Sequence, residues 1–183
     1  MLWLLAGLGN PGRTYAGNRH NIGFMVMDEL GRRCATNFGS KFKSDYARTR
    51  LANTDVVLLK PTTFMNRSGV GLGLAASFFK IPAERVVIVH DELDHEFGRI
   101  QIKMGGGHAG HNGLRSIFEH FGKDFTRVRC GVGKPVHGTV SNYVLSDFAP
   151  QESAHLGGFV DKAADSIESI VRLGPKETMN HFN

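Results

Sequence analysis

Three short, unbroken runs of apolar residues do most to limit how this 183-residue chain can fold. They occupy residues 2–8, 56–59 and 86–89, and each ends at a turn or a polar cluster. Continuous apolar runs of this length are typical of strands that are buried on both faces. Apolar residues at helical spacing follow the first run, at Ile22, Val26 and Leu30. The pattern predicts an α/β protein in which helices cover a layered sheet.

Two later segments show a different periodicity. Residues 99–104 and 126–132 alternate polar and apolar side chains, which predicts strands with one open face. The polar positions there include Lys103, Arg127 and Arg129, so we expect that face to be basic. A glycine-rich loop, residues 105–113, lies between these strands and precedes a predicted helix. A last long helix is expected from Pro150 to the Gly174-Pro175 pair.

The composition is typical of one folded domain spanning residues 1–183, with 41% hydrophobic and 21% charged residues. The apolar opening residues lack a basic lead-in, so they predict a first strand and not a signal peptide. With only two cysteines and no membrane span, a cytoplasmic protein without disulfides is expected. The net charge of +5 favours a polyanionic partner without requiring one.

Polar side chains collect where the predicted strands end. Asn10, Asn66 and Asp91 follow the three apolar runs, Asn112 follows the Lys103 strand, and His20 opens the first helix. Ligands of α/β sheets bind outside the carboxyl ends of the strands, so these five residues predict a site. Taken singly, each has a structural alternative as a turn residue, a helix cap or a hydrogen-bonded helix-end histidine.

The glycine-rich loop leaves other chemistries open. It lacks the Gly-Lys-Ser/Thr of a phosphate-binding P-loop, and no Gly-x-Ser-x-Gly turn supplies a serine nucleophile. His108 and His111 have the spacing of half a metal site, but no Cys-x-x-Cys or His-Glu-x-x-His accompanies them. We therefore expect no metal.

Four motifs, in this order along the chain, resemble those of bacterial peptidyl-tRNA hydrolases. The similarity extends from about Trp3 through the strand end Gly131-Val132-Gly133 to Tyr143-Val144-Leu145 and the terminal helix, which is nearly the whole chain. The motifs are Gly7-Leu8-Gly9-Asn10-Pro11-Gly12 with Tyr15 and Arg19-His20-Asn21-Ile22-Gly23; Lys60-Pro61 with Phe64-Met65-Asn66 and Ser68-Gly69; His90-Asp91-Glu92-Leu93-Asp94; and Gly105-Gly106-Gly107-His108 with Gly110-His111-Asn112-Gly113.

The resemblance implies a monomeric three-layer α/β/α sandwich around a mixed, mostly parallel twisted sheet, which acts without a metal or cofactor. It implies hydrolysis of the ester between a peptide and the 3′-terminal ribose of tRNA, with His20 and Asp91 as catalytic residues. The expected tRNA contacts are the acceptor stem, the 5′-phosphate and the CCA end. The residues that match the family's substrate-binding positions are Asn10, Tyr15, Phe64, Met65, Asn66, His111 and Asn112, and those that match its phosphate clamp are Lys103 and Arg129.

The chemistry of these residues agrees with an ester hydrolase. A histidine with an ordinary pKa of about 6.5 can take a proton from water, and a carboxylate can fix its tautomer. Carboxamides can hold a peptide main chain and stabilise an oxyanion, although the sequence does not say which asparagine does so. Core packing is the alternative for Phe64 and Met65, and a solvated strand face is the alternative for the two clamp residues.

The sequence also departs from the family pattern. Residues 134–140 form a compact segment where the family has a longer basic loop, and the tail past Gly174 is short. Contacts to the body of the tRNA are therefore open. A catalytically inactive RNA-binding relative and a metal-dependent hydrolase are the competing hypotheses.

Overall fold

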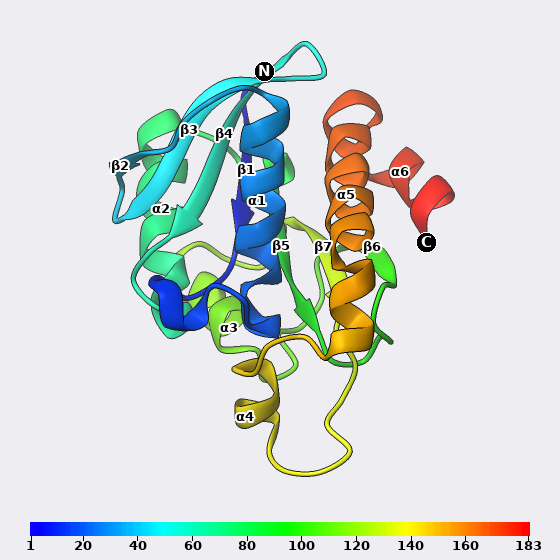
Figure 1. Ribbon diagram of the computed structural model, residues 1–183. Helices are drawn as coiled ribbons and strands as arrows, with labels where there is room; N and C mark the ends of the chain where they lie inside the picture. The colour runs from blue at the N-terminus through cyan, green and yellow to red at the C-terminus, as the bar shows by residue number, and fades with distance from the viewer.

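The computed structural model describes residues 1–183 as one seven-stranded sheet with helices on both faces (Figure 1). The strands lie in the order β2-β3-β4-β1-β5-β7-β6. The four central strands from β4 to β7 are parallel, β3 and β6 pair antiparallel with β4 and β7, and β2 pairs antiparallel with β3. The three-layer α/β/α prediction with a mixed sheet is therefore confirmed. The strands are β1 Trp3–Gly7, β2 Gly39–Lys41, β3 Ser44–Leu51, β4 Thr54–Pro61, β5 Val86–Glu92, β6 Ile100–Met104 and β7 Thr126–Gly131.

Six α-helices complete the layers. The core on one face contains side chains of α1 and α5, and the core on the other contains side chains of α2 and α3. Helix α6 packs beside α5 and β6, and α4 lies below the carboxyl ends of the parallel strands (Figure 1). None of these helices combines the length and apolarity that crossing a membrane requires. The helices are α1 Ile22–Arg33, α2 Ser68–Phe79, α3 Asn112–His120, α4 Val140–Val144, α5 Pro150–Leu173 and α6 Pro175–Phe182.

Burial along the strands explains the two periodicities. Every residue of β1 is buried, because consecutive side chains enter the two cores on opposite faces. On β6 only Ile100 and Ile102 are buried, since α2 and α3 do not extend over that edge of the sheet. The continuous runs mark the covered centre and the alternating run of β6 marks the half-covered edge, as predicted. The open face predicted for residues 126–132 is wrong, because every residue of β7 except Arg129 is buried.

The hairpins at the other edge are structure that the sequence analysis missed. Two-residue turns connect β2 to β3 and β3 to β4, with positive φ at Phe42, Lys43, Ala52 and Asn53. Positive φ at both turn residues is the geometry of a tight hairpin, which sequences usually signal with Asn-Gly or Asp-Gly. Phe-Lys and Ala-Asn carry no such signal, so β2 and β3 were not foreseen.

A close approach of backbone to backbone fixes the start of α1 against the end of β1. A Cβ added to Gly7 would lie 2.0 Å from the carbonyl oxygen of Gly23, and one added to Gly23 would lie 2.4 Å from the amide of Leu8. Only glycine allows this contact. The turn Arg19–Asn21, a single 3-10 turn that precedes α1, is thereby held at the carboxyl edge of the sheet.

Candidate active site

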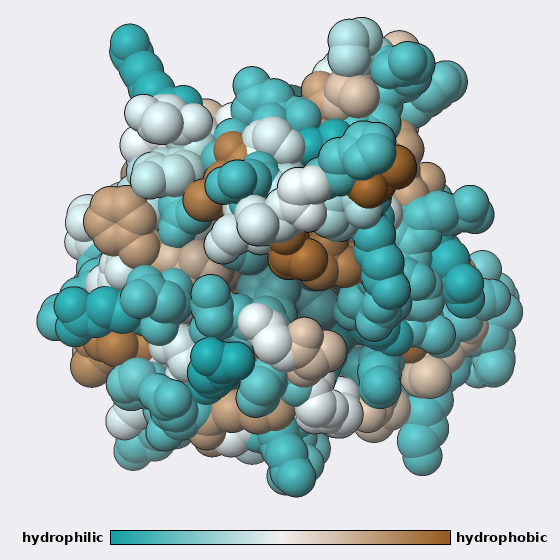
Figure 2. All heavy atoms as spheres, turned by 90° about the horizontal axis from the view of Figure 1, so that it is seen from below, coloured by the Kyte–Doolittle hydropathy of each residue, from teal (hydrophilic) through white to brown (hydrophobic).

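The predicted polar residues meet at the carboxyl edge of the parallel strands. Asp91 lies near the end of β5 with a side chain that is only 2% exposed, while His20 comes from the turn before α1. His111 is the residue immediately before α3. Figure 2 views the molecule from this end and shows mostly hydrophilic side chains around a small hydrophobic area.

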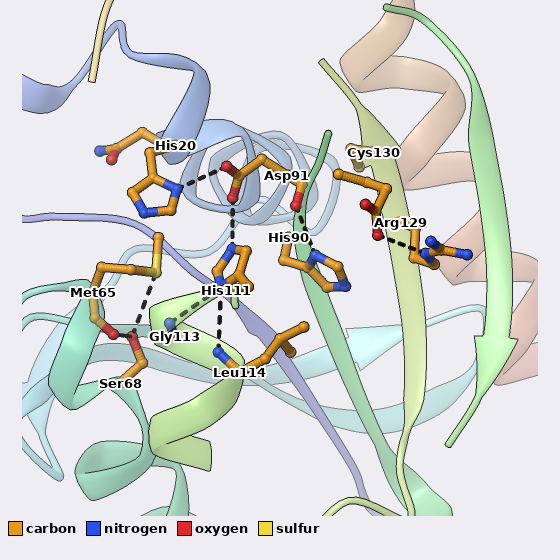
Figure 3. A network of polar contacts seen from close by, with 12 residues as sticks. His20, Met65, Ser68, His90, Asp91, His111, Gly113, Leu114, Arg129 and Cys130 are labelled. Carbon is orange, nitrogen blue, oxygen red and sulfur yellow. Dashed lines mark hydrogen bonds and ion pairs between the residues drawn. The ribbon is translucent and has the colours of Figure 1, made fainter. Parts of the chain in front are cut away.

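Asp91 joins the two imidazoles (Figure 3). Its Oδ2 lies 2.7 Å from Nδ1 of His20, and its Oδ1 lies 2.8 Å from Nε2 of His111. The structure thus brings His20 and Asp91 together as expected from the sequence. It also places His111 in contact with Asp91. The sequence had instead predicted that His111 contacts the substrate.

The N-terminus of α3 determines which nitrogen of His111 carries its proton. Its Nδ1 accepts hydrogen bonds from the backbone N–H groups of Gly113 and Leu114, at 3.1 and 3.3 Å. The proton of the neutral ring is therefore on Nε2, where it is donated to Asp91. The three residues lie close enough for a metal site. Yet the Nε2 of His111 that faces the group has no lone pair to offer, so the donor set does not fit a metal.

The contact between Asp91 and His20 shifts the pKa values of both groups. Burial disfavours the charged form of Asp91, but the adjacent imidazoles outweigh burial and hold the pKa of its carboxyl well below the ordinary range. Burial likewise disfavours protonated His20, but attraction to Asp91 and the hydrogen bond raise the pKa of His20 above 6.5. Asp91 is therefore an anion that makes His20 a stronger base.

A third histidine borders the cluster. His90 is buried, and its Nδ1 lies 2.9 Å from the carbonyl oxygen of Asp91, to which it donates. Burial, together with the neighbouring His111, lowers the pKa of His90 to about 3. His90 is therefore a neutral spacer between the cluster and the basic face, as Figure 3 shows.

The three asparagines occupy different environments. Asn10 is buried, and its Oδ1 accepts a 2.6 Å hydrogen bond from the backbone N–H of Met65. Since the oxygen is engaged in this bond, the Nδ2 group is the end of the amide that remains to donate. Asn66 and Asn112 are exposed, one in the turn before α2 and the other at the first position of α3.

The two apolar residues of the second motif differ in burial. Met65 is 4% exposed and belongs to the core, whereas Phe64 is 51% exposed, so core packing accounts only for Met65. Phe64 has φ 67° and ψ 156°, a backbone conformation that is costly for residues other than glycine. Its ring makes an edge contact with Tyr15, with 6.3 Å between the ring centroids.

The basic face of β6 and β7 agrees only in part with the sequence prediction. Lys103 is exposed, but the Nε of Arg129 donates to Glu92 at 2.8 Å, and its Nη1 donates to Gln101. The expectation that Arg127 is exposed is wrong. Its guanidinium is buried because it donates to the carbonyl oxygens of two residues in the glycine-rich loop, Gly106 and Gly107.

Comparison with known proteins decides the family. The family model described as peptidyl-tRNA hydrolase matches residues 4–183. The chain belongs to the peptidyl-tRNA hydrolase family. A peptidyl-tRNA hydrolase of Geotalea daltonii is 46% identical over 182 residues, covering 98% of this chain and 95% of the relative. One of Dinoroseobacter shibae is 53% identical over 183 residues, covering 97% and 76%.

Solved structures of the family have the same fold. The crystal structure of peptidyl-tRNA hydrolase from Acinetobacter baumannii has a TM-score of 0.94 at 38% identity. The alignment covers 100% of this chain and 94% of that chain. The family architecture therefore extends over the compact segment at residues 134–140 and the short tail, where the sequence departs from the family pattern.

Two contacts in this family member had no recognised sequence signal. The pairing of His111 with Asp91 depends on α3 starting at Asn112. The contact of the Asn21 side chain with the backbone N–H of Asn10 depends on how the loop after β1 folds back. The one feature that could have indicated the His111 contact is its position as the N-cap of α3. The side chain of an N-cap residue accepts hydrogen bonds from the first backbone N–H groups of its helix.

Proposed function

We propose that this chain hydrolyses the ester bond between the peptide and the 3′-terminal ribose of peptidyl-tRNA, releasing free tRNA. The observation that carries this proposal is the contact between His20 and Asp91 at the carboxyl edge of the sheet, in a chain of this family. A histidine base is suited to the hydrolysis of this ester. The ribose 3′-hydroxyl is a good enough leaving group for an activated water to attack the ester directly.

His20 is the proposed general base. Its Nδ1 faces Asp91, so Nε2 is the nitrogen available to a water molecule. As the water oxygen attacks the ester carbonyl, Nε2 takes one of its protons and a tetrahedral oxyanion forms. When the intermediate collapses, the bond to the ribose oxygen breaks and the imidazolium returns the proton to that oxygen. No covalent enzyme intermediate is required.

Asp91 and His111 are the proposed supports of that base. The Asp91 carboxylate orients His20 and stabilises the imidazolium, while the N–H of His111 fixes the second carboxylate oxygen. Because His111 is itself anchored to the backbone of α3, Asp91 is held from both sides. We therefore assign His111 to Asp91 and not to the substrate.

Asn10 is the asparagine that we assign to the oxyanion. Its oxygen is already bonded to Met65, so its Nδ2 is left to donate. Asn66 and Asn112 are exposed and are proposed to hold the peptide main chain, together with Phe64 and with Tyr15, whose ring contacts that of Phe64. Oriented donors of this kind act on the charge that develops in the transition state.

Lys103 and Arg129 are the proposed contacts to the tRNA 5′-phosphate, next to the acceptor stem and the CCA end. Lys103 is exposed, whereas Arg129 must share its guanidinium between Glu92, Gln101 and the phosphate. Charge-assisted contacts to phosphate do not depend on base sequence, which suits a substrate that carries any tRNA. We further propose a monomer that acts in the cytoplasm, where translation supplies the substrate.

The decisive experiment incubates the purified chain with peptidyl-tRNA and follows the release of free tRNA, with and without a strong chelator. Hydrolysis that the chelator does not change is the expected result. Binding of the tRNA without release would establish an inactive RNA-binding relative. Activity that is lost with the chelator and restored by a divalent metal would establish the metal-dependent hydrolase.

A further inference from the structure

Asn21 makes two hydrogen bonds to the backbone of a single residue of the proposed site. Its Oδ1 accepts from the N–H of Asn10 at 2.9 Å, and its Nδ2 donates to the carbonyl oxygen of Asn10 at 2.9 Å. The side chain of Asn21 is buried, with the residue only 1% exposed. One amide therefore satisfies both backbone groups of Asn10, in the way that a neighbouring strand would.

These bonds connect three segments that are distant in the sequence. Asn21 follows His20 in the same 3-10 turn, and Asn10 lies in the loop after β1. Through its own side chain, Asn10 then holds the backbone of Met65 after β4. The turn that carries the proposed base, the proposed oxyanion donor and the loop of Phe64 thus form one hydrogen-bonded unit.

We infer that Asn21 is a positioning residue, which holds the Asn10 amide at a fixed place relative to His20. This inference rests on the proposed function and deepens it. The loop that follows Asn10 contains Gly12 at φ 97° and has no other side-chain bond to the turn of His20, so little else sets the distance between base and donor. Catalytic groups must be held within about 0.5 Å of their working geometry.

Loss of the Asn21 side chain should therefore lower turnover more than it weakens substrate binding. In Asn21→Ala the N–H and C=O of Asn10 lose their partners while buried, and the loop must move to satisfy them. We expect kcat to fall roughly 10- to 100-fold, since misplacing a reacting group by about 1 Å costs up to 10²-fold. The KM for full-length peptidyl-tRNA should change less than about threefold, because the phosphate contacts are untouched.

Asn18 provides a matched control. It is also a buried asparagine beside the same turn, 4% exposed, but its side chain donates to Asp147 at 2.9 Å and does not contact Asn10. Asn18→Ala removes a buried amide of the same kind, so it should lower Tm by a similar amount. Its kcat should stay within about threefold of the wild type, because the Asn10 loop keeps its anchor.

A double-mutant cycle tests whether Asn21 acts through Asn10. The kcat of wild type, Asn10→Ala, Asn21→Ala and the double variant is measured, with Tm recorded for each. If Asn21 only positions Asn10, the double variant should be as slow as Asn10→Ala and no slower, so the two losses are strongly non-additive. Losses in kcat that multiply, or equal kcat for Asn21→Ala and Asn18→Ala, would overturn the inference.

The same four proteins separate failure of the inference from failure of the proposed function. An inactive wild type would contradict the hydrolase function. Wild-type turnover by Asn10→Ala would contradict the oxyanion assignment on which the inference rests. A slow Asn10→Ala protein with a fully active Asn21→Ala protein would contradict the positioning role of Asn21 alone.

Discussion

The cluster of His20, Asp91 and His111 lies on loops and a strand end, whereas the basic face around Lys103 and Arg129 lies within β6 and β7, and their side chains are held in different ways. In the cluster, both carboxylate oxygens of Asp91 have fixed imidazole partners. On the basic face, Lys103 is exposed and Arg129 is shared between two acceptors. The first arrangement is preorganised, whereas the second must rearrange to accept a phosphate.

This difference predicts which substitutions affect turnover and which affect substrate binding. Groups that act on the reacting bond lower the barrier only if their geometry exists before the substrate arrives. Groups that attract a polyanion contribute mainly through charge, which tolerates mobile side chains. Substitutions in the cluster should therefore lower kcat, and those on the basic face should raise KM.

The largest expected effect is that of His20→Ala. Losing the general base should lower kcat by about 10²- to 10⁴-fold with little change in KM. His155→Ala, which removes an exposed histidine of α5, is the control and should be unaffected. Single-turnover rates on peptidyl-tRNA, with circular dichroism to check the fold, make the test. Near wild-type rates in a folded His20→Ala protein would refute the base assignment.

Asp91→Asn should have the next largest effect, with a loss in kcat about tenfold smaller than that of His20→Ala, because the imidazole remains. The pH profile carries a second signature. Asp91 raises the pKa of His20, and the base must be neutral to take a proton. Removing the carboxylate charge lowers that pKa, so the acid limb of the kcat profile should move to lower pH. An unchanged acid limb, or a loss mainly in tRNA binding, would contradict the assigned role.

Replacing Lys103 and Arg129 together by Ala should raise KM for peptidyl-tRNA roughly tenfold while kcat changes little. Each phosphate contact contributes about 0.7 to 0.9 to the slope of log binding constant against log salt, so the slope should fall by about 1.5. The measurement is salt-dependent kinetics on full-length substrate and on a minimal ester without the 5′-phosphate.

The control for the loss of two positive charges is Lys162→Ala combined with Arg172→Ala, which changes two exposed residues of α5. This pair should leave KM and the salt slope nearly unchanged. Equal losses for the clamp variant on full-length and minimal substrates would show that the tRNA phosphate is bound elsewhere.

The smallest expected effect is a gain, from Glu92→Gln. This change removes the carboxylate that Arg129 contacts, so the guanidinium becomes more available to phosphate. Partly exposed ion pairs contribute about 0.2 to 1 kcal/mol, which predicts a fall in KM of roughly 1.4- to 5-fold at low salt. Asp55→Asn, which changes the same charge on β4, separated from β7 by β1 and β5, is the control. A rise in KM would show that Glu92 orients Arg129 for phosphate.

The sequence determined the covered centre of the fold. The apolar runs at residues 2–8, 56–59 and 86–89 became β1, β4 and β5, because a strand buried on both faces must be apolar at every position. The turn residues after those strands also predicted where the polar site would collect. His20 and Asp91 were predicted as a pair, and the structure places them in contact.

Tertiary structure decided what local patterns do not encode. The β2–β3 hairpin turns without glycine, Arg127 turns inward to bond the glycine-rich loop, and Arg129 is paired with Glu92. For the two arginines the partner comes from elsewhere in the chain, so alternation along one strand gives the face of a side chain but not its contacts.

The asparagines and histidines of the site make the same point. Their residue types predicted hydrogen bonding, but the two neighbours His20 and Asn21 face different partners, Asp91 and Asn10. His111 received its tautomer from the N-terminus of α3, and Asn10 received its orientation from Met65. A polar side chain can donate or accept in many ways, and only packing in three dimensions decides which partners it has.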